Sequence, residues 1–473
     1  MYTTPENGGQ NDADYSTMYT TFEALEDGTF SFSKKGTGDD IQYSKDNGAT
    51  WTALVSSKTV SVVTGDKVMW KSTITPIQTK GIGTFSSSNK FNVSGNIMSL
   101  LSGDGYAERT DFLAQTHALY SLFSGCTQLI DVSNLILPVT ALTKTCYGYM
   151  FYKCTSLTTA PELPATTLAE LCYSKMFYGC SGLTSAPELP STTLGDYCYE
   201  RMFFKCTSLT TTPELPATTL ANNCYQYMFE GCTSLTTAPE LPVTTLADNC
   251  YCGMFKGCTS LTTAPELPAT TLAEYCYSQM FQDCTSLTTA PELPATTLAE
   301  YCYSQMFQDC TSLTTAPELP ATTLADYCYP YMFQDCTSLT TAPELPATTL
   351  ADYCYKQMFS GCTSLTTAPE LPATTLANSC YSNMFKGCKS LTAAPELPAT
   401  TLVDYCYNSM FENCSSLNHI TMLATNISAE KCLDFWVRYV SSTGTFVKHP
   451  DMDSLPTNYY GIPYGWTVED AVL

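Results

Sequence analysis

The sequence predicts an α/β repeat solenoid, with an N-terminal all-β domain before the repeats and a C-terminal cap after them. Two observations support this. Cysteine recurs in two series that each step by 26 residues. Within each step, a short strand pattern comes before a short helical pattern. A fixed period of roughly 20 to 50 residues is typical of solenoids, propellers and arrays, so the repeat decides the architecture.

The strand pattern is clear in the unit that begins at Cys154. Its phrase SLTTAPEL places Leu157, Ala160 and Leu163 three residues apart, with polar residues between them. This spacing favours a short, irregular strand whose apolar side chains point inward. The prolines cannot donate hydrogen bonds to a neighbouring strand, so the strand should end there.

The helical pattern follows in the phrase TTLAE. Thr167 and Glu170 have the spacing of a capping box, which predicts the start of a helix. Apolar residues then recur every four positions, at Leu168, Cys172, Met176 and Cys180, with Tyr173 and Phe177 beside them. This stripe predicts a short amphipathic helix.

One strand and one helix in 26 residues is the plan of a leucine-rich repeat, and it is too short for a four-stranded propeller blade. A single unit cannot bury its own apolar face. About seven apolar residues per unit contribute roughly 1.5–3 kcal/mol each only when neighbouring units stack. We therefore expect a right-handed leucine-rich-repeat array of 26-residue units. Its strand side should be about 50–60 Å long and concave, because helices are wider than strands.

The regions around the repeats have other patterns. We expect four parts: a small antiparallel β domain, immunoglobulin-like or sandwich, at 1–100; an N-terminal cap and first repeat at 101–145; the leucine-rich-repeat solenoid at 146–431; and a C-terminal cap at 432–473. Alternating apolar residues and turn phrases predict the β domain. Trp436 and Trp466 are expected to cover the end of the core.

Composition excludes several classes of partner. The chain has 473 residues, with 44 acidic against 21 basic side chains and a net charge of −23. Nucleic acid is not expected as a partner, because phosphate binding needs clustered Lys and Arg.

No apolar run is long enough for membrane insertion. The first residues have no secretory pattern, so either a signal has been removed or the protein reaches its site by another route, such as assembly into a particle.

The phrase MFQDCTSLTTAPELP resembles the unit of BspA-like leucine-rich repeats, in which Ala-Phe stands where this chain has Met-Phe. The resemblance covers residues 123–432, and the unit here is a few residues longer than usual. The flanking segments look like those of proteins from Bacteroides-type gut bacteria and their phages. The resemblance implies a surface protein that binds or adheres, with no catalytic motif, no cofactor and no named partner.

The cysteines allow three interpretations: a disulfide ladder, a metal array, or two columns of small buried residues. Metal sites usually use closer Cys pairs or nearby His. Cysteines eight residues apart on a helix lie about 12 Å apart, beyond the roughly 7 Å that a disulfide can bridge. We favour packing columns with reduced thiols. The first series, which follows Cys126, is Cys154, Cys180, Cys206, Cys232, Cys258, Cys284, Cys310, Cys336, Cys362, Cys388 and Cys414. The second is Cys146, Cys172, Cys198, Cys224, Cys250, Cys276, Cys302, Cys328, Cys354, Cys380, Cys406 and Cys432, and only Cys252 lies outside both.

An acidic column is the candidate binding site. It consists of the glutamates in ten copies of PELP: Glu162, Glu188, Glu214, Glu240, Glu266, Glu292, Glu318, Glu344, Glu370 and Glu396. Such a column could bind cations or a polycation, or it could be a solvated edge that prevents aggregation, which we favour. A similar choice applies to the threonine columns (Thr158, Thr159, Thr166 and Thr167 in one unit), which could form hydrogen-bonded ladders or a flat binding lattice.

The residues that differ between repeats follow each Cys-Tyr and each Met-Phe, and should point outward. They are either a diversified contact surface or neutral drift. We expect a non-enzymatic recognition or adhesion protein on a phage particle or a bacterial cell surface. Its partners would be a cell-surface protein, a glycan or other virion proteins, and a homo-oligomer is also open. The alternative is a purely structural spacer or self-assembling scaffold with no specific ligand.

Overall fold

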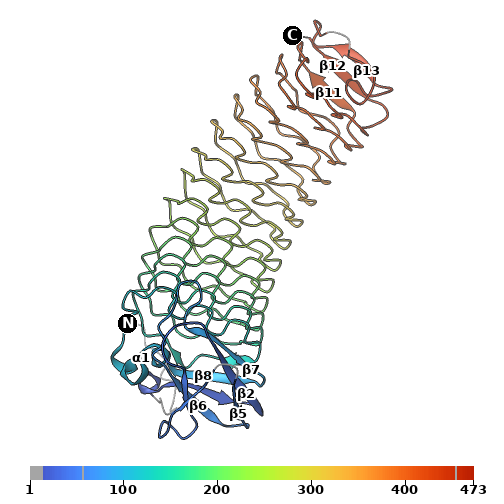
Figure 1. Cartoon of the computed structure of the whole chain (residues 1–473). Coiled ribbons are helices and arrows are strands. Elements are labelled where there is room, and N and C mark those ends of the chain that lie inside the picture. The colour runs from blue at the N-terminus through green and yellow to red at the C-terminus, as the bar shows by residue number, and fades with distance from the viewer. Residues whose placement is uncertain (1–13, 56–57, 453–454, 473) are drawn as a thin grey trace, which may run out of the picture.

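The computed structural model describes residues 14–55, 58–452 and 455–472. The coils of the repeat array stack into a long, bent rod between a β-rich N-terminal region and a small C-terminal sheet (Figure 1). The helices are η1 (Tyr15–Thr17), α1 (Ser99–Ser102) and η2 (Gly103–Glu108). The strands are β1 (Thr20–Ala24), β2 (Gly28–Lys34), β3 (Gln42–Ser44), β4 (Thr52–Ala53), β5 (Thr59–Val62), β6 (Lys67–Lys71), β7 (Gly83–Ser87), β8 (Phe91–Asn96), β9 (Leu129–Asp131), β10 (Leu135–Ile136), β11 (His419–Met422), β12 (Thr445–Lys448) and β13 (Thr467–Asp470). Within the residues that the structure describes, no helix has the length and apolar character needed to cross a membrane.

Two sheets form the N-terminal region. The larger one has the strand order β10-β8-β1-β6-β3-β4, with β9 also paired to β8, and the smaller one has the order β5-β2-β7. Phe22 of β1 lies 5.3 Å from Phe30 of β2 and 4.7 Å from Phe85 of β7, measured between ring centroids, so the sheets pack face to face. Because β9 and β10 extend the larger sheet, a separate domain that ends at residue 100 stays a prediction. Residues 1–13 and 56–57 of that range lie outside the described residues.

The α-helix expected in every repeat is not present, and this part of the α/β prediction is wrong. Among the described residues α1 is the one α-helix, and the segment before each first-series cysteine is a run of turns, here called the turn run. In one such run φ is positive every fourth residue, at 56° for Tyr301, 58° for Gln305 and 60° for Asp309. A right-handed α-helix does not contain such left-handed residues, so no continuous helical ladder forms.

The backbone hydrogen bonds of a turn run alternate in direction. The amides of Met306 and Gln308 donate to carbonyls three residues earlier in the same coil, at 3.2 Å each. The amide of Phe307, between them, donates to the carbonyl of Met332 in the next coil at 2.9 Å. Half of the amides are therefore satisfied only when the next coil is in place, which makes stacking obligatory.

The physical reason for the missing helix is the four-residue period of the apolar side chains. Cys302, Met306 and Cys310 are all fully buried on the inner side of the turn run. On a helix of 3.6 residues per turn, residues four apart drift by about 40° per turn and would not share one face for long. The capping box is also not formed, because the Glu170 carboxylate instead accepts from Lys144 Nζ at 2.7 Å.

The strand phrase makes only isolated bridges between coils. Parallel bridges join Thr289, Thr315, Thr341 and Thr367 in turn, and no continuous strand lies in the described chain between β10 and β11. Threonine side chains add to this contact: Thr340 Oγ1 donates to the carbonyl of Thr314 at 3.4 Å. Of the two interpretations of the threonine columns, these contacts support hydrogen-bonded ladders between coils.

Stacked aromatic columns fill the core of the array. From Phe123 to Phe411, one phenylalanine per coil stacks on the next with centroids 5.4–5.8 Å apart and rings within 9° of parallel. Phe85 of β7 begins the column, 5.7 Å from Phe123. Trp436 ends it, 6.3 Å from Phe411 and tilted by 57°. The array and the N-terminal sheets therefore share one continuous core.

The C-terminal segment closes this core. Strands β11, β12 and β13 form a parallel sheet after the last PELP copy. Trp436 is fully buried and its indole N–H donates to the carbonyl of Gly461 at 2.9 Å. Trp466 is also buried, and its indole N–H donates to the carbonyl of Ser441 at 2.8 Å. Both tryptophans lie where they cover the end of the stack.

Candidate functional site

The ten PELP loops form one exposed row along the array, which we call the PELP face. In each loop the glutamate is exposed, whereas the leucine after it is buried, as at Leu293 with 3% exposure. The strict period fixes this arrangement, because the buried leucine and the prolines hold each loop in the same conformation. The predicted acidic column therefore lies at the surface, with all ten carboxylates accessible to solvent.

Shallow grooves lie between successive PELP loops. Four of them have volumes of about 430 to 570 Å³, and each is lined by two successive glutamates and by proline rings. The groove between Glu240 and Glu266 is lined by prolines of both loops, together with Leu241 and Thr263. The same surface, with two carboxylates beside apolar rings, thus recurs at a fixed interval.

The glutamates of the PELP face have no basic partner within the described chain. Among residues 14–55, 58–452 and 455–472, no Lys, Arg or His nitrogen lies within 4.0 Å of any of these ten carboxylates. Other glutamates of the array are paired: Glu170 with Lys144 at 2.7 Å, and Glu412 with Lys386 at 2.9 Å. The carboxylates of the PELP face are therefore free to accept hydrogen bonds from an external donor.

All 25 cysteines are buried with free thiols. From Cys180 to Cys414, each first-series thiol donates to a phenylalanine carbonyl 29 residues earlier, at 2.9 to 3.1 Å. Burial raises the pKa of Cys146 to about 12 and the pKa of Cys310 well above its usual value. Thiols with such pKa values are neither nucleophiles nor ready metal ligands at neutral pH.

A second side-chain ladder, which the sequence analysis missed, lies at the start of the turn runs. Asp196 Oδ1 accepts from the amide of Asn222 at 3.1 Å, and Asn222 Oδ1 accepts from the amide of Asp248 at 3.2 Å. Further along, Asp352 Oδ1 accepts from the amide of Asn378 at 2.9 Å. The signal was present in the sequence: this position alternates among Asp, Asn and Glu, and only short side chains can reach the next backbone amide.

A basic and aromatic hollow of about 330 Å³ lies on the turn runs of the early coils. It is lined by Tyr149, Tyr152, Lys175, Tyr178, Arg201, Phe204 and Glu230. The rings of Tyr152, Tyr178 and Phe204 stack in sequence, with centroids 4.8 and 4.3 Å apart. Several of these residues occupy the positions that vary between repeats. The prediction that such positions point outward is wrong in part, because Ser174, Glu200 and Ser278, each directly after a Cys-Tyr, are buried, and so is Phe204.

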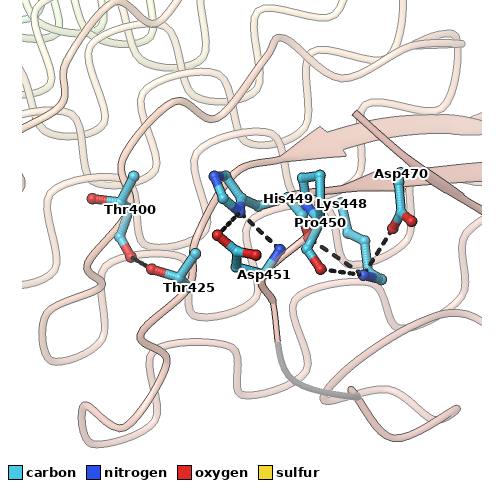
Figure 2. A network of polar contacts seen from close by, with 7 residues as sticks. All are labelled: Thr400, Thr425, Lys448, His449, Pro450, Asp451 and Asp470. Atoms are coloured by element: carbon cyan, nitrogen blue, oxygen red, sulfur yellow. Dashed lines mark hydrogen bonds and ion pairs between the residues drawn. The ribbon is translucent and has the colours of Figure 1, made fainter. Parts of the chain in front are cut away.

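The described residues contain no group of three or more His, Cys, Asp or Glu placed to hold a metal ion. A polar network in the C-terminal cap joins Lys448 to Asp470 at 2.9 Å and brings His449 Nδ1 within 3.9 Å of Asp451 (Figure 2). His449 Nδ1 already accepts from the amide of Asp451 at 3.0 Å. The neighbouring Thr425 hydroxyl donates to the Thr400 carbonyl, so the network shown contains no nucleophile held by a base.

Comparison with known proteins agrees with this repeat geometry. A search of curated proteins finds no match. The model of the BspA type leucine rich repeat region matches six copies, over residues 119–236, 223–366 and 327–432, which together cover about two-thirds of the chain. Proteins with repeats of this type are generally surface-associated and non-enzymatic. The chain belongs to the family of BspA-type leucine-rich-repeat proteins.

Proposed function

We propose that this chain is a non-enzymatic recognition or adhesion protein whose PELP face contacts the ligand. It acts on a bacterial cell surface or as a decoration of a phage particle. The observation that supports this most strongly is the row of near-identical grooves, each with two unpaired carboxylates and proline rings. Repeated, exposed and chemically uniform sites suit a ligand that is itself repetitive.

The chemistry of the grooves favours a hydroxyl-rich polymer such as a neutral glycan. Ionised carboxylates accept strong hydrogen bonds from hydroxyl groups, and the proline rings offer apolar surface to the carbon skeleton of a sugar. A polyanion is disfavoured, because the net charge of −23 repels it. Each groove alone would bind weakly, and simultaneous contact by several grooves raises the overall affinity by about 10²–10⁴-fold.

A purely structural spacer is the second candidate, and one specific observation favours it. The phenylalanine column continues from Phe85 through every coil to Phe411, which makes the array a uniform rod. A rod of identical coils would hold its two ends at a fixed separation without binding anything along its length. The two candidates differ in whether the surface of the array is recognised.

A binding screen separates these two functions. Fluorescently labelled full-length protein would be applied to bacterial cells, host cells and immobilised glycans. Saturable binding that an excess of unlabelled protein abolishes would support recognition. If the protein binds none of these surfaces at micromolar concentration, the spacer is the better explanation.

A further inference from the structure

The residue before each first-series cysteine forms a surface column, which we call the last-turn column. Its members have positive φ, such as 54° at Lys205 and 62° at Asp283. Successive members are neighbours, because the amide of Lys205 donates to the carbonyl of Glu230, directly before the next member, at 2.7 Å. The column therefore runs along the rod with one side chain per coil.

Charge is divided along the last-turn column. The early coils present Lys153 and Lys205, which have no carboxylate within 4.0 Å among the described residues. Three aspartates, of which Asp309 is the middle one, take this position in later coils. Burial and repulsion from the aspartates on either side raise the pKa of Asp309, so the three aspartates together lack compensating positive charge within one chain.

Glycine separates the two charged halves. Gly231 and Gly257 occupy the column between Lys205 and Asp283, with φ of 74° and 70°. Lys205 lies one coil before Gly231, and Asp283 lies one coil after Gly257. Likewise, Lys153 lies three coils before Gly231, and Asp335, the third aspartate of the column, lies three coils after Gly257.

We propose that the last-turn column is a self-association surface, through which two copies of this chain pair antiparallel about a two-fold axis between Gly231 and Gly257. Rotation about this axis places Lys205 of one copy opposite Asp283 of the second, and Lys153 opposite Asp335. Asp309 then lies opposite Gly179, between the two lysines of the other copy. Each pair forms twice, since a two-fold interface is self-complementary. The two glycines add no side chain of their own at the axis, and the stem of Lys205 lies against Gly231.

The neighbouring column supports the same axis. Glu230 and Lys256 precede the two glycines, so the rotation places Glu230 of one copy opposite Lys256 of the other. Within one chain this glutamate has no ion pair within 4.0 Å among the described residues, and burial raises its pKa. If the axis is moved by half a coil, Glu230 of one copy faces Glu230 of the other, or Lys256 faces Lys256. Only one of the two lysine–aspartate pairings then remains. The charge pattern therefore selects one register.

A second copy fits this surface better than an external polyanion. A polyanion would use only the basic half and would be repelled by the acidic half of the same column. The paired stretch from Lys153 to Asp335 spans seven coil steps, about 34 Å. A strip of about 24 Å width would then bury the roughly 800 Å² per partner that is typical of a stable interface.

Sedimentation equilibrium of the full-length chain tests this surface without any ligand of the PELP face. We expect a dimer in 0.15 M salt, where the long-range repulsion between two acidic chains is screened. The charge reversals K205D and D283K should each weaken self-association at least tenfold. An equimolar mixture of the two variants should associate again, because each reversed side chain then faces an opposite charge.

The control is K389D, which makes the same charge change in a coil outside the paired stretch and should leave the dimer intact. The double variant K205D/D283K should also dimerise, and it keeps the test usable if one single variant folds poorly. A native chain that stays monomeric up to 100 µM would overturn the proposal. So would a mixture of folded single variants that fails to associate, or a K205D variant that dimerises as well as K389D.

Discussion

The left-handed residues of the turn runs make a prediction that distinguishes them from a helix. Gln357 has φ of 55°, is half-buried, and makes no side-chain hydrogen bond within the described chain. A positive φ costs a non-glycine residue about 1–3 kcal/mol. Glycine avoids this cost but loses about 0.5–1 kcal/mol of stability, because its unfolded backbone has more conformational freedom. We therefore expect Gln357→Gly to stabilise its coil by about 0.5–1 kcal/mol and Gln357→Val to destabilise it by about 2 kcal/mol.

The assay is native-state hydrogen exchange at the amides of Met358 and Ser360, which bond within the same turn run at 3.2 Å each. Exchange reports the local opening free energy, which suits an array whose coils need not unfold together. Gln308→Gly, followed at the amides of Met306 and of residue 308 in its own turn run, is the matched control. Because Gln308 is not among the left-handed residues, this change should cost about 1 kcal/mol. A helix would give the opposite order at residue 357, with glycine worse than valine. That order would refute the turn-run geometry.

Three further outcomes follow from the packing. Titration of denatured, unreduced protein should find 25 free thiols, and a count far below this would contradict the packing role of the cysteines. Folding raises the pKa of the Cys146 thiol from about 8.5 to about 12, so the folded state holds this proton more tightly. The free energy of unfolding should therefore be unchanged below about pH 8.5 and fall as the pH rises toward 12. A urea midpoint that stays constant from pH 7 to 10 would contradict this. Asp352→Ala should cost about 1 kcal/mol by freeing the amide of Asn378, whereas Glu300→Ala should change stability by less than about 0.5 kcal/mol, both measured by hydrogen exchange.

The period, the inward apolar residues and the repeat family could be predicted from the sequence, because a strict 26-residue step leaves few other architectures. The helix prediction was wrong because a four-residue apolar period was treated as a 3.6-residue one. Pro330 was an available warning: it lies between Tyr329 and Tyr331, inside the expected helix, where proline would break the ladder. In the turn run its carbonyl simply accepts from the amide of Gln305 at 2.9 Å.

The candidate sites were predictable to different degrees. The sequence analysis favoured a solvated edge for the PELP glutamates, and the structure does place these glutamates at the surface. The grooves did not follow, because their shape depends on how far apart successive loops lie. The basic and aromatic hollow was harder still, since Tyr152, Tyr178 and Phe204 come from three coils and meet only after stacking. Single-letter differences between repeats identified the right positions, but not what those positions build together.

The most direct test of recognition by the PELP face is the affinity of the full-length protein for the surface it binds, with and without three of the glutamates. The variant E266Q/E292Q/E318Q removes three carboxylates that line grooves, and E170Q/E274Q/E300Q removes three at the start of the turn runs. Both change the net charge equally. We expect the first variant to bind at least tenfold more weakly and the second to bind like the native chain. Equal affinity of all three proteins would contradict recognition by the PELP face.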